Sequence, residues 1–249
     1  MNLIGKKGFY MGTSGLLTPI PKRDFPPAFQ DKSRLNFYAS LFNSIEINSS
    51  FYKLPVTKTL ARWANEVPDG FRFTFKLWKQ ITHCKYLQFN PEDVLTFLER
   101  ISSVGQKRGM LLVQLPPGLS SAAFNQFAHL VNILAEVTPD LNWPIAVEFR
   151  HRSWYSEYIY DFLDNSGTTM VIHDMPASSA PLRSFAAPYI YFRFHGPGGT
   201  YRNSYEDDFL SEYAVYMREF IEDGKMVYTY FNNTAGDALN NLKMLNSML

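Results

Sequence analysis

Residues 146–150 read Ala-Val-Glu-Phe-Arg, so apolar and ionisable side chains alternate along a short stretch. Successive side chains of a β-strand point to opposite faces of its sheet. The valine and the phenylalanine would therefore face one way, and Glu148 and Arg150 the other. Because buried charges need partners, this stretch predicts a sheet that packs on one face and encloses a polar interior on the other.

Three further apolar runs show the same alternation. In each run, one set of alternate residues is mainly apolar and the other is polar or charged. The polar sets are Glu46 and Asn48 in residues 44–48, Thr74 and Lys76 in residues 72–77, and Arg193 and His195 in residues 189–196. Four separate strands thus indicate a single polar layer inside a closed sheet.

Strand-like and helix-like runs alternate along the 249 residues. Strands are predicted at residues 8–14, 44–48, 72–77, 109–115, 144–149, 168–173, 189–196 and 226–232. Helices are predicted at residues 33–42, 56–66, 91–104, 120–137, 155–165, 205–223 and 234–248. This alternation predicts parallel strand pairing through right-handed crossovers. Eight such units close a (β/α)8 TIM barrel, which usually occupies about 250 residues, so we expect one TIM-barrel domain over residues 1–249.

The sixth unit departs from the pattern. Residues 176–188 contain three prolines and several small residues. Because proline removes a backbone donor and disrupts a helix interior, we expect a short or irregular helix there.

The composition restricts the classes of partner. Lys and Arg number 24 against 23 Asp and Glu, so the net charge of +1 provides no global field for nucleic acid or anionic membrane, although nucleic acid is not excluded as a partner. A single cysteine allows no internal disulfide and fits a reducing compartment. No segment has the signal-peptide pattern or the roughly 20 apolar residues of a membrane span. We therefore expect a cytoplasmic protein without a membrane partner.

Polar or glycine residues stand at or just after the end of nearly every predicted strand. In a TIM barrel the strand C-terminal ends converge on one pocket, where active sites lie. The candidate site residues are Thr13, Ser14, Glu46, Asn48, Lys76, His83, Gln114, Glu148, Arg150, Asp174, Arg193, His195, Gly196, Gly198 and Asn232.

Several of these residues belong to motifs that occur in order along nearly the whole chain. The motifs are Gly-Thr-Ser-Gly (12–15), Glu-Ile-Asn-Ser-Ser-Phe-Tyr (46–52), Ile-Thr-His (81–83), Gln-Leu-Pro-Pro (114–117), Ala-Val-Glu-Phe-Arg-His (146–151), Arg-Phe-His-Gly (193–196) and Phe-Asn-Asn (231–233). Together they resemble the YecE-like family of TIM-barrel proteins, known as domain of unknown function 72. The resemblance implies the barrel and a shared site at the strand ends, but it implies no reaction.

Glu148 and Glu46 are the candidates for acid–base catalysis, with His195 as their partner. Enclosure beside cationic side chains can separate the pKa values of two carboxyl groups, as general acid–base chemistry requires. The alternative is a buried ionic network that fixes the barrel and takes no part in chemistry.

Arg150, Arg193 and Lys76 are the candidates for binding an anionic group through charge-assisted hydrogen bonds. The glycine-rich residues 196–200 and a helix start at residues 233–234 would also suit phosphate binding through backbone N–H groups. The remaining polar wall of the pocket would come from Thr13, Ser14, Asn48, His83, Gln114, Asp174 and Asn232.

A divalent metal is permitted by the residue types but not required. Histidines and carboxylates at the strand ends are metal-ligand types, and they comprise Glu46, Glu148, His173, Asp174 and His195. No spacing motif such as H-E-x-x-H fixes a site, so the metal and any other cofactor stay open.

Three functions therefore stay open. The first is an enzyme of hydrolase or isomerase type that acts on a polar or anionic small molecule, for example one that carries phosphate. The second is a metal-dependent hydrolase of phosphoesters or nucleic acid. The third is a non-catalytic module that binds a nucleotide or nucleic acid. Glycoside hydrolysis by Glu46 and Glu148 would further require carboxyl groups about 5–5.5 Å or 6.5–9.5 Å apart.

Overall fold

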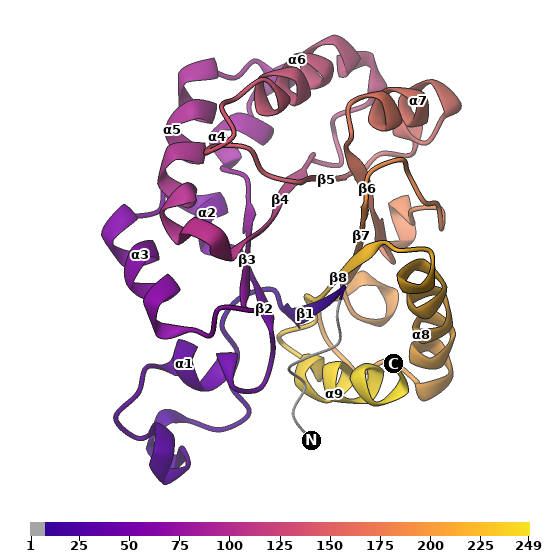
Figure 1. Cartoon of the computed structure of the whole chain (residues 1–249). Coiled ribbons are helices and arrows are strands. Elements are labelled where there is room, and N and C mark those ends of the chain that lie inside the picture. The colour runs from indigo at the N-terminus through magenta and orange to yellow at the C-terminus, as the bar shows by residue number, and fades with distance from the viewer. Residues whose placement is uncertain (1–7) are drawn as a thin grey trace.

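The computed structural model describes residues 8–249 and contains eight parallel strands in a nearly closed barrel (Figure 1). The strands are β1 Phe9–Thr13, β2 Ser44–Ile47, β3 Arg72–Lys76, β4 Arg108–Gln114, β5 Ile145–Glu148, β6 Thr169–His173, β7 Tyr189–Phe194 and β8 Met226–Phe231. Their order is β1-β8-β7-β6-β5-β4-β3-β2. The predicted TIM-barrel fold is confirmed, and each strand lies within two residues of its predicted bounds.

Helices surround the barrel and connect consecutive strands (Figure 1). They are α1 Arg34–Ala39, α2 Ser49–Tyr52, α3 Thr57–Glu66, α4 Lys79–Thr82, α5 Pro91–Ile101, α6 Phe124–Ala135, α7 Glu157–Asn165, α8 Asp207–Glu222 and α9 Ala238–Met248. After β6 the chain forms only a 3-10 turn at Pro176–Ser178, as the prolines predicted. The one-turn helices α2 and α4, which follow β2 and β3, were not predicted.

Two helices start four residues later than predicted, whereas the other predicted helices start within two residues of the expected position. α6 begins at Phe124 after a 3-10 turn, and α9 begins at Ala238. The prediction of a helix start at residues 233–234 is wrong, because Asp237 occupies the N-cap position of α9, and the Asn233 side chain donates to Asn203 O at 2.9 Å and to Asn241 Oδ1 at 3.0 Å. The start of α9 is therefore not positioned as a phosphate site beside Asn233.

The two faces of the sheet pack differently. The outer face joins the helices in a large apolar core that includes Phe73, Phe75 and Val147. The inner face forms a second cluster that includes Leu112, Tyr191 and Tyr230. Burying such apolar surface stabilises the fold by roughly 1.5–3 kcal/mol for a full aliphatic or phenyl side chain. The alternation in the sequence thus separates the helix-facing core from the barrel interior.

Side chains rather than a regular ladder close the barrel between β1 and β2. The two strands share one isolated bridge, between Ser14 and Glu46. Asn43 supplements it, because its amide accepts from Met11 N at 2.9 Å and donates to Phe9 O at 2.8 Å. A Cβ on Gly12 would lie 2.0 Å from Ser44 O, so only glycine permits this close approach.

Besides Asn43, Tyr38 of α1 also joins β1 and β2 at the seam, the place where the barrel closes. Its hydroxyl accepts from Thr13 N at 2.7 Å and donates to Ser44 O at 3.1 Å. The ring is fully buried, so no solvent can replace these bonds. A helix residue therefore completes the hydrogen bonding of two strands.

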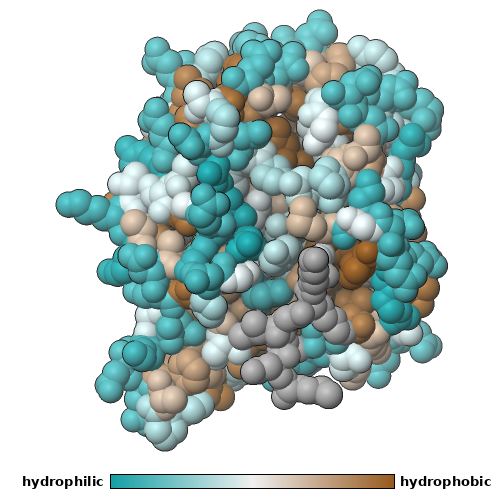
Figure 2. Space-filling model, in the orientation of Figure 1, coloured by the Kyte–Doolittle hydropathy of each residue, from teal (hydrophilic) through white to brown (hydrophobic). Residues whose placement is uncertain are grey.

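The outer surface carries mainly hydrophilic side chains on the face drawn in Figure 2, with apolar side chains in small groups between them. Within residues 8–249, no helix has the length and apolar character needed to cross a bilayer.

Tyr38→Phe should lower the free energy of unfolding by about 1–3 kcal/mol, because it leaves the buried Thr13 N–H without an acceptor. Urea denaturation followed by circular dichroism measures the loss. Tyr158→Phe is the matched control, because Tyr158 is 64% exposed, and it should change stability by no more than about 0.5 kcal/mol. Equal stability of the two variants would show that Tyr38 does not close the seam.

Candidate functional site

Arg193 lies at the centre of a buried ionic cluster inside the C-terminal end of the barrel. From β7 its Nη2 donates to Glu46 Oε1 at 2.9 Å, and its Nε lies 3.1 Å from both Glu46 oxygens. Its Nη1 donates to Glu148 Oε2 at 3.0 Å. Both glutamates have no exposed surface, and Arg193 is 1% exposed. One guanidinium therefore joins the carboxylates of β2 and β5 across the barrel.

Glu46 is fully occupied by this cluster. Besides Arg193, its carboxylate accepts from Ser14 Oγ at 2.6 Å and from the Tyr191 hydroxyl. Burial acts to raise the pKa of Glu46, but the charge and hydrogen bonds of Arg193 outweigh it and hold that pKa below its usual value. Glu46 is thus ionised at neutral pH and bound to Arg193.

Glu148 has a second cationic partner. Arg150, two residues further along the chain, donates from Nε to Glu148 Oε1. Burial opposes ionisation here too, yet Arg150 and Arg193 hold the pKa of Glu148 well below its usual range. Glu148 is therefore a carboxylate at neutral pH and carries no proton to donate.

The contacts of His195 define its protonation state. Its Nε2 lies 2.8 Å from Arg150 Nη2 and 2.9 Å from Arg193 Nη1, and guanidinium groups can only donate. Nε2 must therefore accept both bonds, which places the ring proton on Nδ1, 3.2 Å from Asp174 Oδ1. Burial lowers the pKa of His195 to about 4, in agreement with a neutral ring.

Asp174 fixes the orientation of His195 through hydrogen bonds on the side of the ring away from the arginines. Its Oδ1 also accepts from the backbone N of His195 at 2.8 Å, and its Oδ2 accepts from the Tyr205 hydroxyl. Burial would raise the pKa of Asp174, but these hydrogen bonds keep it lowered. Asp174 thus stabilises the ring orientation and does not line the mouth.

A pocket of about 320 Å³ opens above the cluster at the strand C-terminal ends. Its walls are Asn48, Phe51, Tyr52, Lys76, Gln114, Arg150, Arg193, Tyr201, Asn232 and Thr234. Three of these residues are cationic and none is acidic, while the two glutamates lie underneath. The pocket is therefore lined by positive charge and is suited to an anionic group.

Lys76 occupies one side of this mouth. Its Nζ donates to Gln114 Oε1 at 2.6 Å and lies 4.2 Å from the centre of the Phe51 ring. Burial lowers the pKa of Lys76 to about 8, and the charge of Arg193 adds to the effect. Lys76 therefore titrates much closer to neutrality than an ordinary lysine does.

Several candidate residues lie away from the pocket walls. Thr13 is fully buried with its side chain bonded to Gly15 O and Tyr38, and Ser14 donates to Glu46 beneath the mouth. His83 is exposed, and the centre of its ring lies 4.8 Å from the centre of the Phe51 ring. These positions do not favour Thr13 or Ser14 as direct ligand contacts.

The glycine-rich loop after β7 also differs from an open anion cradle. The N–H of Gly196 donates to the Tyr205 hydroxyl at 2.5 Å, so it is not available to a ligand. Gly198 is exposed in a 3-10 turn. The structure thus brings Lys76, Arg150 and Arg193 together but assigns the loop glycines to turn geometry.

Tyr201 and Tyr191 are site residues that were not predicted. The inward parity of β7 includes Tyr191, so the alternation was a usable signal for it. Tyr201 comes from a loop, has a left-handed φ of 61° and places its ring 5.7 Å from that of His195. No periodicity in the sequence marks such a loop residue.

The metal-ligand types do not assemble into a cluster. Within residues 8–249, no three His, Cys, Asp or Glu side chains lie together in a group that could hold a metal ion. His173 is one reason, because its Nε2 donates to Phe149 O at 2.8 Å and its Nδ1 accepts from Met175 N at 3.3 Å. Both ring nitrogens of His173 thus serve the local backbone.

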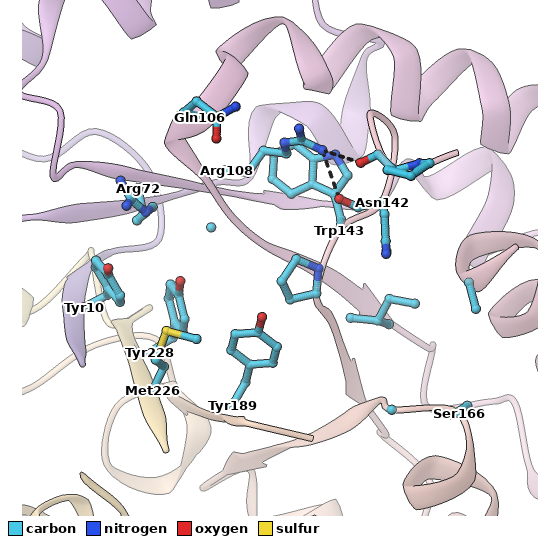
Figure 3. A pocket seen from close by; sticks show the side chains of 16 residues that line it. Tyr10, Arg72, Gln106, Arg108, Asn142, Trp143, Ser166, Tyr189, Met226 and Tyr228 are labelled. Atoms are coloured by element: carbon cyan, nitrogen blue, oxygen red, sulfur yellow. Dashed lines mark hydrogen bonds between the residues drawn. The ribbon is translucent and has the colours of Figure 1, made fainter. Parts of the chain in front are cut away.

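A larger hollow of about 720 Å³ lies at the opposite end of the barrel, around the strand starts (Figure 3). Tyr10, Tyr189 and Tyr228 point into it beside Arg72 and Arg108. Nη1 of Arg108 lies within hydrogen-bond distance of three backbone carbonyls, at 2.9–3.3 Å. Because barrel active sites lie at the strand C-terminal ends, size alone does not make this hollow the functional site.

The comparisons with known proteins agree with the fold. The family described as "Protein of unknown function DUF72" matches residues 10–249. The UPF0759 protein YunF of Bacillus subtilis is 27% identical over 256 residues, covering 90% of this chain and 89% of that protein. The UPF0759 protein YecE of Escherichia coli K12 is 30% identical over 123 residues, covering 49% of this chain and 43% of that protein.

Solved structures of other proteins have a similar backbone fold. A DUF72 family protein from Enterococcus faecalis superposes with a TM-score of 0.80 at 21% identity, covering 97% of this chain and 95% of that one. A DUF72 family protein from Thermotoga maritima gives a TM-score of 0.72 at 26% identity, covering 96% and 98%. Both share the barrel with this chain.

The neutral state of His195 predicts a specific pH dependence of stability. Its folded pKa lies below the unfolded value of about 6.5, so the unfolded chain binds more protons as the pH falls and stability is lost. Between pH 7 and pH 5 the His195 contribution should fall by about 2 kcal/mol. His195→Gln keeps an acceptor for the arginines but cannot titrate, so its urea stability should vary less over this interval.

His129→Gln is the control, because His129 is exposed on α6. It should follow the wild-type pH profile. A His195→Gln profile that parallels the wild type would contradict a neutral buried His195.

Proposed function

We propose that this chain, which belongs to the DUF72 family of proteins of unknown function, binds a small anionic molecule at the strand C-terminal ends. The molecule would carry carboxylate or phosphate, and the protein would act on it as an enzyme. The observation that supports this most is the separation of charge at the mouth. Lys76 and Arg150 face the pocket, whereas Glu46 and Glu148 are completely buried below.

Unused hydrogen-bonding groups support a ligand in this pocket. Within the described residues, Nε and Nη2 of Arg150 have partners but Nη1 has none. Oδ1 of Asn48 is buried and has no partner among residues 8–249. Buried polar groups are normally hydrogen-bonded, so an orphan acceptor and a free guanidinium nitrogen in one pocket favour a bound molecule there. Such a molecule would present both an acceptor and a donor.

The geometry favours electrostatic rather than acid–base roles for the two glutamates. Glu148 as a general acid would need a proton at neutral pH, which Arg150 and Arg193 oppose. His195 as a general base would need a free Nε2, but two guanidinium groups occupy that nitrogen. Glu46, Glu148 and His195 are therefore proposed to hold the arginines in position.

Two alternatives receive less support from the geometry. Glycoside hydrolysis needs carboxyl groups that face the sugar, whereas Glu46 and Glu148 are fully buried and bind the same guanidinium. Metal-dependent phosphoester cleavage needs a ligand cluster, and none forms among residues 8–249. Binding without catalysis would use the same cationic mouth, and activity measurements distinguish it from the enzyme.

Titration with inorganic phosphate tests the binding site. Arg150→Gln should weaken phosphate binding by about tenfold or more, since a charge-assisted hydrogen bond contributes about 1.5–3 kcal/mol. Isothermal titration calorimetry at low salt measures the affinity, and circular dichroism checks that the variant is folded.

Arg152→Gln is the matched control, because Arg152 is exposed and its Nε donates to Ala177 O at 3.0 Å. Its affinity for phosphate should equal that of the wild type. If phosphate and acetate both fail to bind the wild type, or bind Arg150→Gln equally well, the proposed anion site is wrong.

A further inference from the structure

Lys76 differs from the other cations of the mouth in its partners. Arg150 and Arg193 each contact a buried glutamate, whereas Lys76 has no carboxylate within 4.0 Å among the described residues. Its hydrogen-bond acceptor is the neutral amide of Gln114, at 2.6 Å. Its amine is therefore held in the pocket without a counter-ion that would fix its proton.

Gln114 is itself fixed in orientation. Its Nε2 donates to Leu115 O at 3.3 Å, which directs its Oε1 to the Lys76 amine. On another side, the face of the Phe51 ring lies 4.2 Å from Nζ. The amine is thus positioned by an acceptor and an apolar surface, and its remaining directions are open to the pocket.

Burial increases the share of Lys76 that is uncharged. With its pKa at about 8, about one tenth of the side chain would be free amine at pH 7. An ordinary lysine with a pKa of about 10.4 has about 0.04% free amine at the same pH. A desolvated lysine next to other cations is a known form of activated nucleophile.

We propose that Lys76 is a catalytic nucleophile that forms an imine with the carbonyl carbon of a small substrate whose anionic group is bound by Arg150. This inference rests on the proposed anion site and adds a substrate class to it: an aldehyde or ketone that also carries carboxylate or phosphate. The walls of the pocket provide both parts, because Lys76 and Arg150 line the same cavity.

The reaction is balanced without an oxidant or a reductant. The neutral Nζ attacks the carbonyl carbon, the C=O electron pair moves to oxygen, and proton transfer gives a carbinolamine. The hydroxyl then takes a proton from the solvent at the open mouth of the pocket, and the nitrogen lone pair expels it as water, which leaves a protonated imine. Addition of water in reverse restores the amine and the carbonyl compound. The positive imine nitrogen withdraws electrons from the adjacent carbon, as in other lysine Schiff-base enzymes.

Reductive trapping tests the amine directly. The purified protein is incubated at pH 7.5 with sodium cyanoborohydride and either pyruvate, which is anionic, or propanal, which is neutral. Peptide mass spectrometry then measures the modification of each lysine with time. Lys76 should be labelled at least about tenfold faster than Lys79, an exposed lysine three residues away. Lys76→Arg should remove this fast site, whereas Lys79→Arg should retain it.

The two probes separate the inference from the proposed anion site. Arg150→Gln should slow pyruvate labelling of Lys76 by a larger factor than propanal labelling, because both probes lose the Arg150 charge that lowers the Lys76 pKa and only pyruvate also loses its anion contact. Labelling of Lys76 at the rate of Lys79 with both probes would overturn the imine role, even if phosphate still binds. Fast propanal labelling together with equal slowing of both probes in Arg150→Gln would support the amine and overturn the part assigned to Arg150.

Discussion

The shared guanidinium of Arg193 is the interaction on which the rest of the site depends. It joins Glu46 of β2 to Glu148 of β5 where neither carboxylate reaches solvent. Removing one partner of a buried ion pair typically costs about 3–5 kcal/mol, because the remaining charge stays buried. The three residues therefore form one unit. Arg150 and Arg193 form ion pairs with Glu148 and Glu46, so among the cations of the mouth Lys76 is the one without an acidic partner in the described residues.

This ionic unit also controls the chemistry available at the mouth. Both arginines donate hydrogen bonds to His195 Nε2, and Asp174 Oδ1 accepts from Nδ1, so the imidazole has a fixed tautomer. The carboxylates stay ionised below the arginines. Under the proposed function, the residues above the cluster would therefore contact the ligand, and the residues inside the cluster would hold the arginines in place.

Much of this arrangement could be predicted from alternation alone. Glu148, Arg193 and their neighbours point inward because their parity differs from that of the apolar residues, and the structure confirms the barrel that this implies. The sequence could not show how charges pair across the barrel, because pairing depends on which strands face each other at one height. Nor could it reveal Tyr38 and Tyr201, which enter from a helix and a loop where no strand period applies.

Both ends of the barrel contain arginines, so the hydrogen-bond partners of these arginines can be compared between the two candidate anion sites. Arg72 and Arg108 at the strand starts donate to backbone carbonyls, whereas Arg150 at the strand ends keeps Nη1 directed to no described acceptor. Crystals soaked in selenate would locate bound anions by anomalous scattering. The proposed site predicts a selenate within hydrogen-bond distance of Arg150 Nη1 and Lys76 Nζ. Ordered selenate only in the hollow at the strand starts, with none at Arg150 and Lys76, would contradict it.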